Sequence, residues 1–243
     1  MEEGWDSLKF WTSPAWAGIQ ERLDGLDKRH ILYNPDRSNM FRALDLVPFE
    51  RCKVAILGQD PYPQHKFATG VAFAIPAGEP TWPTTLVNIF KEYCNDLGTV
   101  GNGHVTSYPL PTTGDLTPWT EQGVLLWNAT PTYQRTKLST GEVINSHYYW
   151  NWNELTEEII TKLSGKPQGM VFALLGGKAR EFVNCIDDTS NYIIETSHPS
   201  SRGVNSKPRK PGSWTPFQGS RLFSTINDKL VQLKHKPIDW RLP

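Results

Sequence analysis

The sequence predicts a single-domain α/β fold in which a central parallel sheet of about four strands is flanked by helices. Four short apolar runs, each ending in polar or turn residues, alternate with segments of helical periodicity. Strands that alternate with helices are typical of a parallel sheet covered on both faces. The length of 243 residues and a hydrophobic content of 38% suit one globular domain with a substantial core.

The elements follow from these patterns in chain order. Residues 1–45 are predicted to be an N-terminal helical part, because apolar and aromatic side chains recur there at roughly helical spacing. The run VAIL at 54–57 stops at Gly58 and is typical of a buried strand. Further strands are expected within 123–130, 170–180 and 192–201, and helices at 85–97, 149–164 and 220–233.

Polar or small residues follow each predicted strand. In open parallel sheets, ligands bind in a crevice beyond the carboxyl ends of the strands. The sequence therefore predicts one ligand crevice at this edge. The residues expected near it are Gln59, Asp60, Asn128, Gly176 and His198.

Composition excludes several classes of protein. No apolar run approaches the ~18 residues that a membrane span needs, and MEEGWDSLKF lacks a basic region followed by an apolar stretch. We therefore expect no membrane association and no secretion. Cys52, Cys94 and Cys185 form no CxxC pair, which argues against a zinc site or a disulfide framework. The absence of a GxSxG turn argues against an ordinary α/β hydrolase.

Charge is distributed unevenly, although the formal net charge is zero. No acidic residue lies between Glu195 and Asp228, whereas cations are frequent there. Within this stretch, residues 203–216 (GVNSKPRKPGSWTP) contain three prolines, two glycines and three cations, a composition typical of a long exposed loop. The loop is either a solvated linker or part of a cationic binding surface. The cations of the stretch are Arg202, Lys207, Arg209, Lys210 and Arg221.

Three residues after the predicted strands are candidates for chemistry, and each has a plainer interpretation. Asp60 and His198 both precede proline, where an isolated Asp or His most often serves as a turn residue. Asn128 follows LLW and could cap the strand end. Singly, none of these residues establishes a site.

The motifs together are more informative. GQDPYP, AxGVAF, LLWNAT, LLGGKA, SHPSS and FxxSRLFSTIN occur here in the order in which similar motifs occur in the family 1 uracil-DNA glycosylases, which the chain resembles. The resemblance extends from about Val47 to KPIDW at 236–240. It implies an enzyme that flips uracil out of DNA and hydrolyses its bond to deoxyribose.

The resemblance also implies how uracil is bound. Asn128 matches the residue whose amide accepts from N3–H and donates to O4, an arrangement that cytosine cannot satisfy in the same way. Phe73 matches the aromatic residue on which uracil stacks, and Tyr62 matches the residue that excludes the methyl group of thymine. Gln59 lies where backbone amides add further polar contacts.

For catalysis, the resemblance implies two opposing groups. Asp60 would stabilise the positive charge that develops on the sugar and would position or deprotonate the attacking water. His198 would donate a hydrogen bond to uracil O2, for which a neutral imidazole suffices. No lysine occupies a matching position, so we expect no covalent intermediate, and neither a metal nor an organic cofactor is expected.

DNA would be held by small residues and by the cationic stretch. Thr85, in PTWPTTL, matches a hydroxyl residue of the phosphate-contacting loop of the family. Lys207, Arg209 and Lys210 would extend the contact with DNA. The other residues in matching loops are Gly176, Gly177, Ser200 and Ser201.

Two positions depart from the usual pattern of the family. Pro63 replaces a histidine, and Arg202 stands where a leucine normally enters the space left by the flipped base. An arginine could still stack on bases in that space. The two departures resemble the poxvirus branch of the family, and residues 203–216 exceed its usual short connection.

Two alternatives to a repair enzyme stay open. The fold could serve as a DNA-binding or replication-processivity partner, although the set of Asp60, Asn128 and His198 favours activity. A related glycosylase with another base preference is disfavoured by Tyr62 and Asn128. The expected partners are uracil-containing DNA and either a DNA-mimicking inhibitor protein or a replication partner. We expect a monomer, cytoplasmic in a bacterium or virus and nuclear in a eukaryote.

Overall fold

Four parallel strands form the central sheet where the apolar runs predict them. In the computed structural model, which describes residues 4–101, 104–106, 110–137 and 143–243, their order is β4-β1-β7-β8. Every residue of β1, β4 and β7 is buried, which explains why these strands are continuous apolar runs. The predicted fold class is confirmed. The strands are β1 (Val54–Gly58), β4 (Val124–Asn128), β7 (Val171–Leu175) and β8 (Tyr192–Thr196).

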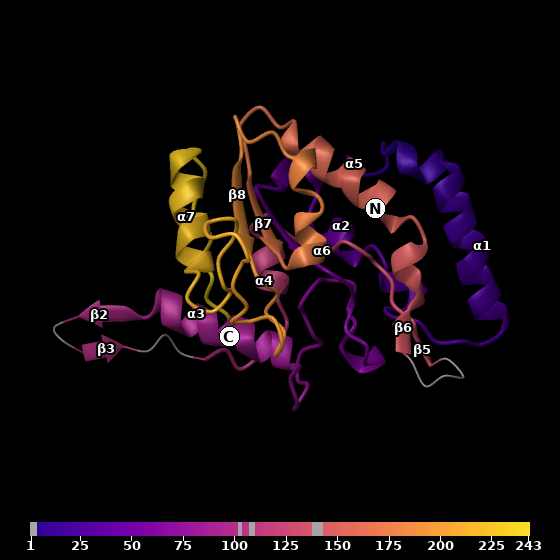
Figure 1. Cartoon of the computed structure of the whole chain (residues 1–243), viewed down its shortest axis with the longest axis horizontal. Coiled ribbons are helices and arrows are strands. Elements are labelled where there is room, and N and C mark those ends of the chain that lie inside the picture. Colours follow the sequence, from indigo (N-terminus) through magenta and orange to yellow (C-terminus); the bar gives the residue numbers. More distant parts are fainter. Residues whose placement is uncertain (1–3, 102–103, 107–109, 138–142) are drawn as a thin grey trace.

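Helices cover both faces of the sheet (Figure 1). Because successive strand residues point to opposite faces, neighbours in β1 belong to different hydrophobic clusters: Ala55 and Leu57 to one, Val54 and Ile56 to the other. The first cluster includes residues of α1 (Pro14–Lys28), α2 (Arg42–Leu46), α5 (Trp152–Ser164) and α6 (Gly177–Arg180). The second includes residues of α3 (Thr84–Leu97), α4 (Thr117–Thr120) and α7 (Leu222–Gln232).

Short elements complete the chain between the main helices and strands. Two antiparallel hairpins, β2–β3 and β5–β6, were not expected, because strands of three residues are too short to produce a recognisable period. The hairpin strands are β2 (Thr99–Gly101), β3 (His104–Thr106), β5 (Arg135–Lys137) and β6 (Val143–Asn145). The 3-10 helices are η1 (Lys9–Thr12), η2 (Arg37–Asn39), η3 (Phe49–Arg51), η4 (His65–Phe67), η5 (Ser146–Tyr149) and η6 (Val183–Cys185). None of the described helices is both long and apolar enough to cross a membrane.

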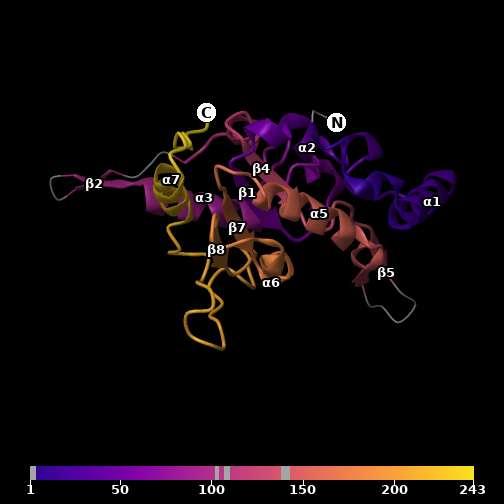
Figure 2. The same cartoon turned by 90° about the horizontal axis from the view of Figure 1, so that it is seen from above.

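Residues 203–216 leave the fold beyond β8 as a projecting loop (Figure 2). The far end of the loop returns to the sheet, since Thr215 forms a parallel bridge with Thr196 of β8. Trp214 lies against α6, with its ring centroid 4.4 Å from the guanidinium carbon of Arg180. The cationic segment is therefore held at its C-terminal end, whereas the side chains of Lys207, Arg209 and Lys210 are exposed.

A buried lysine fixes the chain that leads into β1. Lys166, which follows α5, is only 4% exposed, and its ammonium donates hydrogen bonds to the carbonyl oxygens of Phe49, Glu50 and Cys52 at 2.8, 3.0 and 2.7 Å. Burial lowers the pKa of this lysine. Its three hydrogen bonds tie α5 to the segment from which β1 starts.

Replacing Lys166 by methionine should therefore destabilise the fold. Three inward carbonyl groups would lose their donor, and we expect Lys166→Met to lower the free energy of unfolding by about 3 kcal/mol. Urea denaturation followed by circular dichroism measures the change. Lys91→Met, at an exposed position of α3, is the matched control and should change stability by less than about 0.5 kcal/mol. Equal losses in the two variants would contradict a role for the buried hydrogen bonds.

Candidate active site

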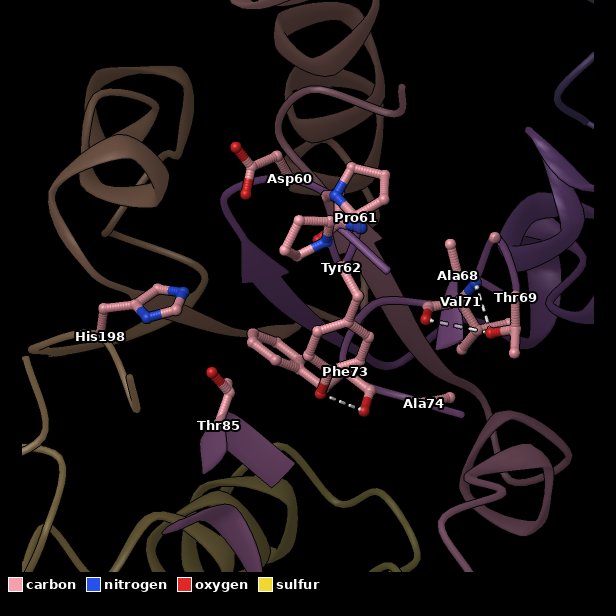
Figure 3. A pocket seen from close by; sticks show the side chains of 13 residues that line it. Asp60, Pro61, Tyr62, Ala68, Thr69, Val71, Phe73, Ala74, Thr85 and His198 are labelled. Atoms are coloured by element: carbon pink, nitrogen blue, oxygen red, sulfur yellow. Dashed lines mark hydrogen bonds between the residues drawn. The ribbon is translucent and has the colours of Figure 1, made fainter. Parts of the chain in front are cut away.

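The carboxyl ends of the strands surround a cavity of about 120 Å³. Polar and aromatic side chains from the segment between β1 and α3, from the start of α3, from β4 and from the loop after β8 border the same space (Figure 3). The crevice predicted from the strand ends is thus present. The sequence-predicted residues that line it are Asp60, Tyr62, Phe73, Thr85, Asn128 and His198.

At Gly58, the absence of a side chain lets the Asn128 amide and the Phe73 ring lie close to the backbone. Gly58 pairs with Asn128 across β1 and β4. A Cβ at Gly58 would lie 2.8 Å from Asn128 Oδ1 and 2.8 Å from Phe73 Cζ, so any other residue would push the amide and the ring apart. Asn128 is 8% exposed, and its side-chain amide has no hydrogen-bond partner among the described residues. Since buried amides normally have partners, this amide is available to a ligand.

Phe73 is held in an uncommon backbone conformation. Its φ of 67° lies in the left-handed region, which non-glycine residues seldom adopt away from functional sites. The hydroxyl of Tyr62 donates a hydrogen bond of 2.8 Å to the Phe73 carbonyl oxygen. This bond joins the loop after β1 to the segment that carries the aromatic ring, and both side chains border the cavity (Figure 3).

His198 is confined by two glycines. A Cβ on Gly176 would lie 2.8 Å from the His198 Cβ, and one on Gly203 would lie 2.5 Å from the His198 carbonyl oxygen. The backbone N–H of Ser200 donates a hydrogen bond of 3.1 Å to His198 Nδ1. Burial lowers the pKa of His198 to about 4. At neutral pH the imidazole is therefore uncharged, and because Nδ1 accepts, the proton resides on Nε2.

Asp60 lies half-buried at the rim of the cavity, directly beyond β1. Strand pairing continues past the end of β1, since Thr130 donates its backbone N–H to the Gln59 carbonyl oxygen at 2.9 Å. Two prolines follow in Pro61-Tyr62-Pro63, which limits the freedom of the loop. Gln59 itself is exposed, donates from Nε2 to Asp60 Oδ2 at 3.3 Å, and does not line the cavity.

Sequence reasoning missed Asn34, which lies far from the motifs. The side chain of Asn34 is 5% exposed, and its Nδ2 donates a hydrogen bond of 2.8 Å to the Tyr62 carbonyl oxygen. Its Oδ1 lies 2.9 Å from Nδ1 of His65. Asn34 therefore fixes the loop that carries Asp60 and Tyr62. An asparagine before a proline in the N-terminal part carries no sequence signal for this contact.

Most of the residues predicted to contact DNA do not line the cavity. Thr85, the second residue of α3, does line it. Gly177 begins α6 with its backbone exposed, and a Cβ there would meet nothing within 4 Å. The loop after His198 carries the half-buried Ser200, followed by the exposed Ser201 and Arg202.

The protonation state of His198 can be measured directly. We expect nitrogen chemical shifts of its imidazole to show a neutral ring with the proton on Nε2 from pH 8 down to about pH 5, because the pKa is about 4. In the unfolded chain the pKa returns to about 6.5. Below that value the unfolded state binds the extra proton first, so stability falls as the pH drops from about 6.5 towards 4. Titration near 6.5 in the folded protein, or a proton on Nδ1, would contradict this assignment.

Comparison with known proteins agrees with this geometry. Residues 44–230 match the family model of the uracil DNA glycosylase superfamily. The chain is 37% identical to uracil-DNA glycosylase 2 of Streptomyces avermitilis over 95% of its length and 89% of that protein, and 39% identical to the uracil-DNA glycosylase of Enterococcus faecalis over 95% and 90%. The crystal structure of mimivirus uracil-DNA glycosylase covers 95% of this chain and 83% of its own at 26% identity, with a TM-score of 0.77. The chain therefore belongs to the uracil-DNA glycosylase superfamily.

Proposed function

We propose that this protein is a DNA-repair glycosylase that flips uracil out of DNA and hydrolyses its N-glycosidic bond, giving free uracil and an abasic site. The observation that carries the proposal is the cavity in which Asp60, Asn128 and a neutral His198 converge in a member of this superfamily. Enclosure is required, because the bond under attack is inaccessible while the base is stacked in the duplex.

Uracil is selected by hydrogen bonds and by shape. The Asn128 amide accepts from N3–H and donates to O4 of uracil, and its lack of a partner within the described chain supports this role. Phe73 stacks on the base. Tyr62, whose hydroxyl is engaged by the Phe73 carbonyl oxygen, presents its ring near C5 and excludes the methyl group of thymine.

Hydrolysis separates charge between the sugar and the base. As the bond between C1′ and N1 breaks, its electron pair passes to uracil, and positive charge develops at C1′. The Asp60 carboxylate stabilises that charge and orients the water that attacks C1′. His198 donates from Nε2–H to uracil O2, which is the role that its accepting Nδ1 and low pKa support. The water loses a proton and the uracil anion gains one.

DNA is held at the mouth by backbone and small side chains. Thr85 lies at the N-terminus of α3, a helix of 14 residues whose free N–H groups favour a phosphate. The exposed backbone at Gly177 allows a phosphate to approach closely. The small side chains of Ser200 and Ser201, which follow His198, allow the same. Gln59 contributes its backbone, since its side chain is turned to Asp60.

Within the superfamily we assign the chain to family 1, with poxvirus-like departures. The ordered motifs from GQDPYP to FxxSRLFSTIN carry the family assignment, and Pro63 and Arg202 are the poxvirus-like departures. The exposed side chain of Arg202, four residues after His198, suits insertion into the space left by the flipped base. A mimivirus UNG variant that is 25% identical has been solved in complex with UGI. By analogy, an inhibitor protein that mimics DNA would bind the mouth of this cavity.

The activity is tested with purified protein, in the presence of a chelator, on oligonucleotides that contain U:A, U:G, single-stranded U, T:G or unmodified C. We expect release of uracil from the uracil-containing oligonucleotides and no release of thymine or cytosine from the others. The absence of release from every uracil substrate would refute the proposed function, and loss of release on addition of chelator would refute the metal-free mechanism.

Asp60→Asn and His198→Ala should each reduce the rate of uracil release by roughly a hundredfold or more, because each removes stabilisation that acts mainly in the transition state. Affinity for uracil-containing DNA should change less than about tenfold. Single-turnover kinetics and equilibrium binding measure the two quantities. Asp188→Asn, at an exposed position, is the control. Equal losses of binding and turnover would contradict the assigned roles.

Replacing Lys207, Arg209 and Lys210 together by alanine should flatten the dependence of DNA affinity on salt, because removing one cation that neutralises a phosphate reduces the slope by about 1. Fluorescence anisotropy at several salt concentrations gives the slope. The matched triple variant removes Lys9, Lys28 and Arg29, three exposed cations in or beside η1 and α1. If the two triple variants have the same slope, residues 203–216 do not contact phosphate.

A further inference from the structure

A second hollow, of about 360 Å³, lies beside the cavity and has no role in the proposed reaction. Its walls come from the segment after β4, from η5 and the start of α5, and from α6 and the residues that follow it. We call it the flanking groove. Its lining residues used below are Thr130, Tyr148, Tyr149, Glu157, Lys178 and Glu181.

Residues that line the flanking groove directly follow residues of the active site in the chain. Ala129 and Thr130, which form one wall, directly follow Asn128 in the chain. The backbone N–H of Thr130 donates a hydrogen bond to the carbonyl oxygen of Gln59, the residue before Asp60. The opposite wall begins at Lys178, which directly follows Gly177. The two hollows are thus bordered by consecutive residues, Asn128 and Ala129, which puts the groove within reach of a nucleotide next to a uracil bound in the cavity.

Tyrosine side chains form the groove's outer wall. Tyr149 is 75% exposed, which is high for a large aromatic side chain. Behind it, Tyr148 is fixed: the Lys178 ammonium lies 3.8 Å from its ring centroid and hydrogen-bonds its hydroxyl. The two tyrosine rings meet edge to face at 5.0 Å. Tyr149 is thus an exposed ring on a rigid support.

The charges of the groove favour a base over a phosphate. Glu157 and Glu181 both line it, and the ammonium of Lys178 is already paired with Glu181 at 2.9 Å. Two carboxylates beside one neutralised cation would repel a phosphate. They can accept hydrogen bonds from the ring and exocyclic N–H groups of a nucleobase, and the exposed face of Tyr149 offers a stacking surface.

We propose that the flanking groove binds an unpaired nucleobase adjacent to uracil, stacked on Tyr149. The proposal rests on the proposed function, because it takes the neighbouring uracil to occupy the cavity. It makes single-stranded DNA, or DNA unpaired on one side of the uracil, the substrate that uses both sites. A base in a continuous duplex stays stacked on its neighbours and does not reach Tyr149.

The test is a thermodynamic cycle measured by equilibrium binding in an Asp60→Asn background, where uracil stays attached. Single-stranded oligonucleotides carry uracil with normal neighbours, or with an abasic residue on the 5′ side or on the 3′ side. Tyr149→Ala should weaken binding of the normal oligonucleotide about tenfold, and Tyr149→Phe should retain affinity within about twofold. On the side where the base contacts Tyr149, an abasic neighbour should weaken binding by the Asp60→Asn parent about tenfold. The same abasic neighbour should not weaken binding by the Tyr149→Ala variant any further.

Val231→Ala serves as the control, since Val231 is 59% exposed on α7, which packs on the opposite face of the sheet from α5. The proposal is wrong if Tyr149→Ala binds the normal oligonucleotide as tightly as the parent does. It is also wrong if Tyr149→Ala weakens binding by the same factor for the normal, the 5′-abasic and the 3′-abasic oligonucleotides. Uracil release by the unaltered protein is measured separately. Absence of release refutes the enzyme activity, whereas absence of coupling in the cycle refutes only the flanking groove.

Discussion

The approach of β1 to β4 at Gly58 and Asn128 is the constraint on which the site depends. The two residues face each other at the carboxyl end of the sheet, and the absence of a side chain at Gly58 lets the Asn128 amide and the Phe73 ring share one space. Pairing beyond the strand ends then fixes the path of Gln59 and Asp60. One backbone contact thus positions the Asn128 amide, the Phe73 ring and the Asp60 carboxylate together.

Burial supplies the electrostatics of this cavity. The same desolvation that lowers the pKa of His198 to about 4 makes the ring a neutral donor, and the N–H of Ser200 selects the nitrogen that carries the proton. Because the imidazole is neutral, it carries no positive charge that would attract the Asp60 carboxylate. In the proposed reaction, this absence of attraction leaves the space between Asp60 and His198 to the base.

Outside the cavity, the surface that we propose to contact DNA has two chemically different parts. The loop of residues 203–216 supplies exposed cations suited to phosphates and is anchored by Trp214 on Arg180 and by Thr215 beside β8. The flanking groove supplies tyrosines and carboxylates suited to a base. In the proposed complex, the loop binds the backbone of the DNA strand and the flanking groove binds a base next to the uracil.

The sequence by itself determined the fold class and the side chains that converge, because buried parallel strands leave continuous apolar runs and their carboxyl ends share one edge. Asp60, Asn128 and His198 could be placed near one crevice from strand ends alone, and their roles came from the resemblance. Only the tertiary structure decided the partners of these residues. The hydrogen bonds from Asn34 to Tyr62 and from Lys178 to Tyr148 join segments about 30 residues apart whose spacing has no period. Such contacts arise from packing in three dimensions, so no local pattern records them.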